Sequence, residues 1–173
     1  MKIQNCRRKG YSDLSFMDPT TCNCRLLRDN PDEIFQNLYK YFAVQHDKFK
    51  ILFPYNFADH WILLVIIPEF SLVIVMDSLR RDPQQYKDHT DMLKSVWKKI
   101  VQNHKGNYSQ TLKIKTDFSC MRQAQGTNLC AYLSMYKQGT KDLLVYIHIE
   151  HAQASWSSEV LSRMAVRSRE DAQ

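Results

Sequence analysis

Apolar residues recur along the chain with two different spacings, and the changes between them divide the chain into expected helices and strands. The stretch "NPDEIFQNLYKYFAVQH", residues 30–46, has apolar residues three and four positions apart, which is typical of an amphipathic helix. Asn30 stands where a helix N-cap is expected, and Pro31 suits the first helical position. The pattern therefore predicts a helix from Pro31 onward that lays one apolar stripe on a core.

The three apolar runs that follow are rich in β-branched and aromatic residues, and they predict strands. They are "FKILFPYNF" (49–57), "HWILLVII" (60–67) and "SLVIVMD" (71–77). The first is expected to end at Pro54, and the "PEF" between the other two is a turn signal. The last two runs are nearly continuous in apolar residues, so we expect both faces of their sheet to be covered.

The second half of the chain continues the alternation. Residues 82–107 have apolar residues at helical spacing and finish with the helix-closing signal "HKG", and residues 111–116, "TLKIKT", alternate as a half-buried strand. Three more elements are expected: a short helix at 129–138, a strand or buried helix at 142–151, and a final helix at 157–171. Together these elements predict one mixed α+β domain over residues 1–173, with a loop-rich part at 1–30.

Composition narrows the class of protein. The chain has 173 residues, of which 44% are hydrophobic, enough for one buried core. The N-terminus has no apolar signal-peptide core, and no apolar run reaches the roughly 18 residues of a spanning helix. We therefore expect an intracellular protein, nuclear or cytoplasmic, that does not bind membranes. Its five cysteines are then expected to be free thiols.

The sequence gives little support for a metal or a nucleic-acid partner. Cys22 and Cys24 form a C-x-C pair, but no second pair stands at ligand spacing, so no metal and no cofactor is expected. The net charge of +6 favours a solvated basic surface. Binding to nucleic acid stays open as the less favoured alternative.

One candidate for chemistry lies at the open end of the predicted hairpin. If a four-residue loop, 67–70, joins the two strands, Leu64 lies opposite Val73 and His60 lies opposite Asp77. Opposed residues share a face, so the carboxylate orients the imidazole, fixes its tautomer and raises its basicity. That pair is half of a nucleophilic triad. The alternative is a structural histidine at a strand end with an acidic neighbour.

A second candidate lies in "QAQGTNLCAY", residues 123–132. Gly126 permits a tight turn, and the next residues can cap a helix that carries Cys130 in its first turn. The positive end of the helix dipole lowers the pKa of such a thiol, and the free backbone N–H groups there can hold an oxyanion. Gln123 offers a side-chain donor for the same purpose. The alternative is a buried structural cysteine.

The order of these residues, His60, Asp77, Gln123 and Cys130, resembles the Ulp1/SENP-type ubiquitin-like-protein cysteine proteases of the C48 papain-like superfamily. The chain is similar above all to the plant branch that CACTA-type transposons carry. Three strings carry this resemblance: "FPYNFADHWILLVI", "MDSLRRDPQQY" and "QAQGTNLCAYL". The resemblance covers roughly residues 2 to 136. It implies a papain-like fold of the Ulp1 type, in which helices flank a central mixed or antiparallel sheet.

The resemblance also implies roles. Cys130 would be the nucleophile and His60 its base, while Asp77 would orient His60. Gln123 would donate a hydrogen bond to the oxyanion, and Trp61 would help to roof a tunnel that admits only a Gly-Gly tail. The implied partner is a SUMO-like ubiquitin-like modifier or its conjugates, bound by a monomer.

Two departures from the family leave alternatives open. Ala131 stands where the family usually has glycine, and residues 137–173 diverge. The chain is also shorter than a full catalytic domain of this family, which predicts C-terminal truncation. One alternative is a catalytically impaired, transposon-derived remnant of the same fold, and another is a nucleic-acid-associated accessory module.

Overall fold

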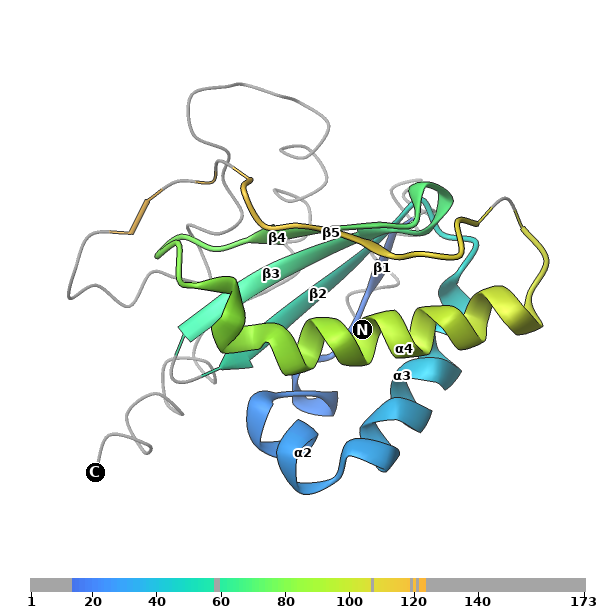
Figure 1. Ribbon diagram of the computed structural model, residues 1–173, viewed down its shortest axis with the longest axis horizontal. Coiled ribbons are helices and arrows are strands. Elements are labelled where there is room, and N and C mark those ends of the chain that lie inside the picture. The colour runs from blue at the N-terminus through green and yellow to red at the C-terminus, as the bar shows by residue number, and fades with distance from the viewer. Residues whose placement is uncertain (1–13, 58–59, 107, 119, 121, 124–173) are drawn as a thin grey trace, which may run out of the picture.

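In the part of the chain that the structure describes, a five-stranded mixed sheet forms the centre (Figure 1). The computed structural model describes residues 14–57, 60–106, 108–118, 120 and 122–123. The strands follow one another across the sheet in chain order: β1 (Leu14–Phe16), β2 (Lys50–Phe57), β3 (His60–Ile67), β4 (Leu72–Met76) and β5 (Lys113–Lys115). β2, β3 and β4 are antiparallel, and the short outer strands β1 and β5 each pair in parallel with a neighbour.

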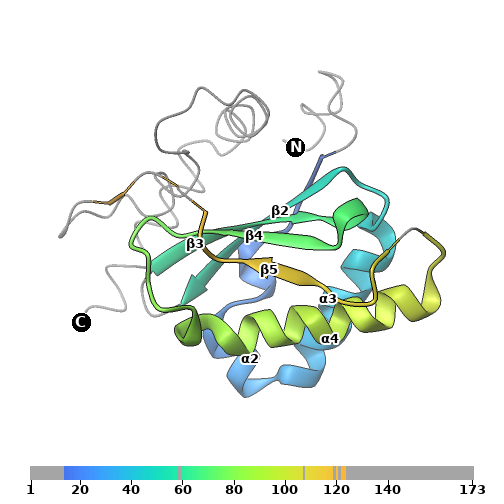
Figure 2. The ribbon, with the colours of Figure 1, turned by 45° about the horizontal axis from the view of Figure 1, so that its top comes forward.

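Three helices lie on one and the same face of this sheet, as the turned view of Figure 2 shows. They are α2 (Cys24–Asp29), α3 (Pro31–Gln45) and α4 (Lys87–Asn103), and three short 3₁₀ turns stand at Pro19–Thr21 (η1), Pro68–Phe70 (η2) and Pro83–Tyr86 (η3).

The mixed α+β class expected from the sequence is confirmed. The elements expected at 129–138, 142–151 and 157–171 lie outside the described residues. None of the helices in the described part of the chain is long and apolar enough to cross a membrane.

The start of α3 and the end of α4 follow the sequence signals, whereas α2 lies in the part of the chain that was expected to be loop-rich. α3 begins at Pro31 as predicted, but the Asn30 side chain makes no capping hydrogen bond. Its backbone N–H donates instead to Leu26 O at 2.8 Å, because Asn30 also ends α2. α4 closes at His104 as expected, and the N–H of this residue donates to Ile100 O at 2.9 Å.

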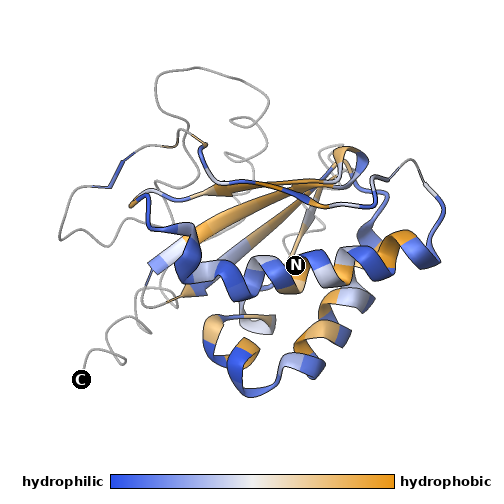
Figure 3. Ribbon diagram, in the orientation of Figure 1, coloured by the Kyte–Doolittle hydropathy of each residue, from blue (hydrophilic) through white to orange (hydrophobic). Residues whose placement is uncertain are grey.

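Both faces of β3 are buried, as its continuous apolar run predicts, whereas β4 is buried on one face and half-buried at Leu72 and Ile74 on the other. The two strands are coloured as hydrophobic along most of their length in Figure 3. Along β3 the side chains alternate between two clusters. Ile62, Leu64 and Ile66 belong to the larger core under the helices, whereas Leu63, Val65 and Ile67 belong to a smaller cluster on the opposite face. The same alternation in β4 puts Val73 and Val75 on the helix side.

The register of the β3–β4 hairpin differs from the predicted one by two residues. Leu64 pairs with Val75, where Val73 was expected, and the loop runs from Pro68 to Ser71. The cause is the turn itself. Ser71 adopts a left-handed conformation with φ of 49° and donates its N–H to Pro68 O at 2.9 Å, so β4 starts one residue later than expected. A shift of two leaves every side chain on its predicted face, because the period of a strand is two.

The expectation that Pro54 ends its strand is wrong. β2 continues through Pro54, which pairs with Leu63 of β3. β1 pairs only with residues 50–52, so in the described structure β2 has a partner on one side alone at this point. A proline, which lacks an N–H, is tolerated at such a sheet edge.

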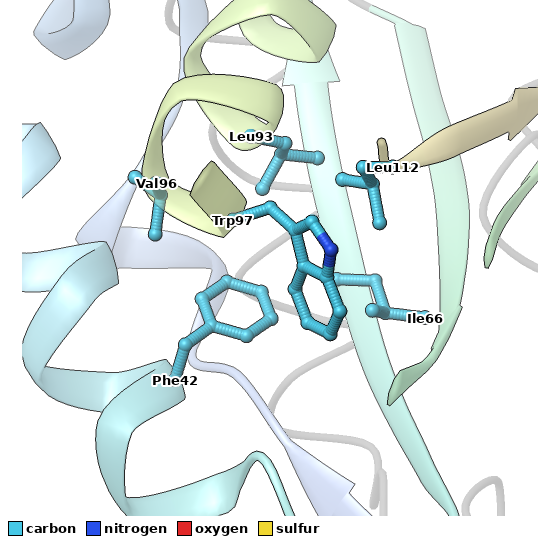
Figure 4. Close-up of a pocket in the computed structure, with 6 residues that line it drawn as sticks. All are labelled: Phe42, Ile66, Leu93, Val96, Trp97 and Leu112. Carbon is cyan, nitrogen blue, oxygen red and sulfur yellow. The ribbon is translucent and has the colours of Figure 1, made fainter. Parts of the chain in front are cut away.

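Among the described residues, Trp97 of α4 is the largest fully buried side chain, and it joins α3, α4 and the sheet. Its indole lies among side chains of α3, α4, β3 and the residue before β5, with no room left for a water molecule (Figure 4). The lining residues are Phe42, Ile66, Leu93, Val96 and Leu112. Its indole N–H donates to Ser109 O at 3.1 Å. The ring therefore fills the core and also fixes the connection from α4 to β5.

We expect Trp97→Ala to destabilise the fold by about 3–5 kcal/mol, because the core cannot collapse fully onto a cavity of this size. The free energy of unfolding in urea measures the loss. Val44→Ala on the exposed side of α3, where the side chain is 70% exposed, is the control and should change it by less than about 0.5 kcal/mol. Equal effects of the two substitutions would contradict this account of the core.

His89 of α4 is a buried, neutral histidine. Its ring stacks on Tyr55 at 3.8 Å between centroids, and its Nδ1 lies 3.7 Å from Cys22 Sγ. Within the described part of the chain its Nε2 has no hydrogen-bond partner. Burial lowers the pKa of His89 from 6.5 to about 3, because the charged form has lost its water. Burial, and after it the nearby Cys24, raises the pKa of Cys22 to about 12.

His89 should therefore weaken the fold at acid pH. Between about pH 6.5 and pH 3 the unfolded chain binds a proton at this site and the folded chain does not, so stability falls as pH falls. The slope from this one group is up to about 1.4 kcal/mol per pH unit. Urea unfolding from pH 7 to pH 4 should show a shallower decline for His89→Phe, whereas Tyr55→Phe should keep the slope of the parent protein. An unchanged slope in His89→Phe would count against neutral burial.

Candidate active site

His60 and Asp77 form a buried hydrogen-bonded pair at the end of the hairpin. His60 Nε2 lies 2.6 Å from Asp77 Oδ1, and the two side chains are 2% and 5% exposed. His60 is the first residue of β3 and Asp77 follows the last residue of β4. In the observed register the two positions are diagonal rather than directly opposed, and they share the helix-side face. The contact predicted from the sequence thus forms through a different pairing.

The Asp77 carboxylate also organises the loop that follows it. Oδ1 accepts the backbone N–H of Leu79 at 2.9 Å, and Oδ2 accepts that of Arg81 at 2.7 Å. Between them, Arg80 adopts a left-handed conformation with φ of 51°, which is uncommon for a residue with a side chain. Both oxygens of the carboxylate are therefore engaged, and the loop is wrapped around them.

These contacts determine the protonation state of Asp77. Burial raises the pKa of its carboxyl group, but hydrogen bonds from His60, Arg81 and Leu79 and the charge on His60 outweigh burial and hold the pKa below 3.8. Asp77 is therefore an anion near neutral pH. An ionised carboxylate on Nε2 orients the ring and stabilises its protonated form.

Two aromatic side chains pack beside the pair. The Phe57 ring packs edge-on against His60 at 5.5 Å between centroids, and Tyr86 packs against Phe57 at 5.4 Å. Burial, followed by the charges of Asp77 and Asp82, raises the pKa of Tyr86 to about 12. The Tyr86 phenol is thus neutral. The two rings restrict the orientation of the imidazole and limit the access of water to its hydrogen bond with Asp77.

Gln123 reaches the same site through Ser78, the residue after Asp77. The Gln123 backbone N–H donates to Ser78 O at 3.0 Å, and the Ser78 hydroxyl donates to Gln123 Oε1 at 3.2 Å. Three of the predicted site residues, His60, Asp77 and Gln123, are therefore brought together. Ser78, Phe57 and Tyr86 were not singled out from the sequence, although the "MDS" string contains the serine.

Of the other residues predicted for the site, Trp61 is the one that the structure describes. Cys130 and Ala131 lie outside the described residues. Trp61 is half-buried and pairs with Asn56 of β2, and strand alternation puts it on the face opposite to His60.

Two other described cysteines are buried and lack the environment of a reactive thiolate. Cys120 is close to Asp77, but burial, and then the charge of Asp77, raises the pKa of its thiol. Burial does the same at Cys22. Among the residues that the structure describes, no group of three or more His, Cys, Asp or Glu side chains is placed to hold a metal. A cavity of about 480 Å³ lies between the β1 end and α3, and it contains none of the predicted site residues.

Residues 32–128 match the model of the Ulp1 protease family, C-terminal catalytic domain. The chain belongs to the Ulp1 protease family. The matched segment includes His60, Asp77 and Gln123, and it ends two residues before Cys130. No curated protein sequence matches the chain.

Solved structures share the Ulp1 fold at low sequence identity. A de-sumoylating protease aligns with a TM-score of 0.55 at 15% identity, over 78% of this chain and 55% of its own. The Ulp1-like SUMO protease catalytic domain of Chaetomium thermophilum aligns with 0.54 at 18% identity, over 77% and 53%. The Xanthomonas campestris effector XopD bound to ubiquitin aligns with 0.51 at 16% identity, over 91% and 75%. The chain thus spans about half the length of the first two structures.

The pairing of His60 with Asp77 can be tested without any substrate. We expect the Asp77 carboxyl group to titrate below 3.8, and the midpoint to rise in His60→Phe, which keeps the site buried but removes the donor. Carbon-13 NMR of the carboxyl carbon measures both midpoints. His46→Phe, at the C-terminal end of α3 where the ring packs beside His104 and Tyr108, should leave the midpoint unchanged. A midpoint that stays the same in His60→Phe would argue against the hydrogen bond.

Proposed function

We propose that this Ulp1-family chain is a cysteine-type peptidase and isopeptidase that cleaves after the C-terminal glycine of a SUMO-like modifier. The observation that carries the proposal is the buried hydrogen bond of 2.6 Å between His60 Nε2 and the ionised Asp77 carboxylate. The similar structures support the substrate class, since one is described as a de-sumoylating protease, another as a SUMO protease, and a third was solved with ubiquitin.

The proposed reaction begins with proton transfer from the Cys130 thiol to His60. Asp77 occupies Nε2, so the proton is received at Nδ1, on the other side of the ring. The thiolate then adds to the carbonyl carbon of the scissile bond, and the carbonyl electron pair moves onto oxygen. Asp77 stabilises the resulting imidazolium, because its negative charge lies at hydrogen-bonding distance.

Collapse of the tetrahedral intermediate completes the first half. The oxygen pair re-forms the carbonyl, the carbon–nitrogen bond breaks, and His60 returns the proton to the leaving amine. A thioester between Cys130 and the modifier glycine remains, and water activated by His60 hydrolyses it. Gln123 and the Cys130 backbone N–H donate to the oxyanion in both halves.

Two finer features belong to the same proposal. Trp61 helps to roof a narrow channel for the Gly-Gly tail, next to the histidine that opens β3. The chain also derives from the plant branch of the family that CACTA-type transposons carry, as the strings around His60, Asp77 and Cys130 suggest. Comparison of the genomic flanks with transposon ends tests this origin.

A covalent probe tests the activity directly. SUMO with a C-terminal vinyl sulfone should label the folded protein once, at Cys130, and Cys130→Ser should abolish labelling. His60→Ala should slow it by about a hundredfold or more, because the thiol loses its base. Mass spectrometry identifies the modified residue, and the band shift on a gel gives the rate.

Cys24→Ser is the matched control and should label as fast as the parent protein. If the folded chain reacts with neither the SUMO probe nor the ubiquitin probe, the activity proposal fails and the remnant of the same fold is favoured. Ala131→Gly then separates two causes: labelling that appears in this variant places the defect at the residue after the nucleophile.

A further inference from the structure

Ser78 holds Gln123 at two points, one on the main chain and one on the side chain. Ser78 O accepts the Gln123 backbone N–H at 3.0 Å, and the Ser78 hydroxyl donates to Gln123 Oε1 at 3.2 Å. Ser78 is itself 2% exposed, so water competes little for either hydrogen bond. The backbone contact places the residue and the side-chain contact orients its amide.

The side-chain contact has a directional consequence. A glutamine amide is planar, with an acceptor oxygen at one end and a donor NH₂ at the other. In the structure the Ser78 hydroxyl donates to Oε1, so the NH₂ group is turned the other way. The flipped orientation would present an acceptor oxygen where the proposed oxyanion needs a donor.

Ser78 is in turn fixed by its neighbour. Asp77 accepts the N–H groups of Leu79 and Arg81, so the backbone that follows Ser78 is tied to the carboxylate of the residue before it, which also binds His60. Consecutive residues of one loop thus serve the imidazole and the amide. A displacement of this loop changes both together.

We propose that Ser78 is a positioning residue that sets the orientation of the Gln123 amide, so that its NH₂ group faces the oxyanion of the tetrahedral intermediate. The kinetic part of this inference rests on the proposed function. The structural part, that the Ser78 hydroxyl fixes the amide, stands on the hydrogen bonds alone.

Two substrates separate this role from a general structural one. SUMO with a C-terminal aminomethylcoumarin amide reacts through a tetrahedral oxyanion, whereas the vinyl sulfone probe adds the thiolate to a carbon–carbon double bond and forms no such oxyanion. We expect Ser78→Ala to lower kcat on the amide about three- to tenfold, the scale of one hydrogen bond, with KM within about twofold. The rate of vinyl sulfone labelling should stay within about twofold of the parent.

A double substitution tests whether Ser78 acts through Gln123. Gln123→Ala should lower kcat about a hundredfold as an oxyanion donor is lost, and adding Ser78→Ala should cost no more than about twofold further. Ser15→Ala is the matched control, since it removes a buried hydroxyl that bonds Tyr41 at the far edge of the sheet, and it should keep the parental kcat.

An unchanged kcat in Ser78→Ala, an equal loss in turnover and labelling, or losses that multiply in the double variant would each overturn the inference. A folded parent protein that cleaves no SUMO amide would instead overturn the proposed function. In that case proton–nitrogen NMR decides on Ser78. The side-chain NH₂ signals of Gln123, assigned by their loss in Gln123→Ala, should shift in Ser78→Ala, and signals that do not move would refute the positioning role.

Discussion

The Asp77 carboxylate is the constraint on which the rest of the site depends. A buried anion without partners costs several kcal/mol, so it has to be met by donors. Here one imidazole and two backbone N–H groups meet it, and each of them is held in place as a result. The left-handed conformation of Arg80 costs about 1 kcal/mol. The hydrogen bonds that it allows offset that strain.

The core and the site share the same face of the sheet. His60 and Asp77 continue the rows of side chains that pack under α3 and α4, so the apolar layer leads directly into the polar pair. Phe57 belongs to the core and touches the imidazole. Low polarity around the pair strengthens its electrostatic attraction relative to the same pair in open water.

Much of the fold was predictable because it rests on periodic signals. The predicted register of the hairpin was wrong by two residues, but the side chains of β3 and β4 still lie on their predicted faces. A shift by an even number of residues does not change the face of a side chain. Pro54 was misjudged because the sequence does not show where a strand lacks a neighbour. Ser78 was missed because one loop serine has no periodic signal, and its role appears only when a segment some 45 residues away is placed against it. The nucleophile predicted at Cys130 lies beyond the described residues.

The two halves of the site differ in how far apart along the chain their contacts lie. His60 and Asp77 are 17 residues apart within one hairpin, whereas Ser78 and Gln123 are 45 apart. Closing the longer loop costs about 0.9 kcal/mol more chain entropy, and two hydrogen bonds hold it. The His60–Asp77 pair is thus built within one hairpin, whereas Gln123 is joined to that hairpin from a distant part of the sequence. Loss of the Ser78–Gln123 contacts alone would withdraw the proposed oxyanion donor and leave the hairpin folded.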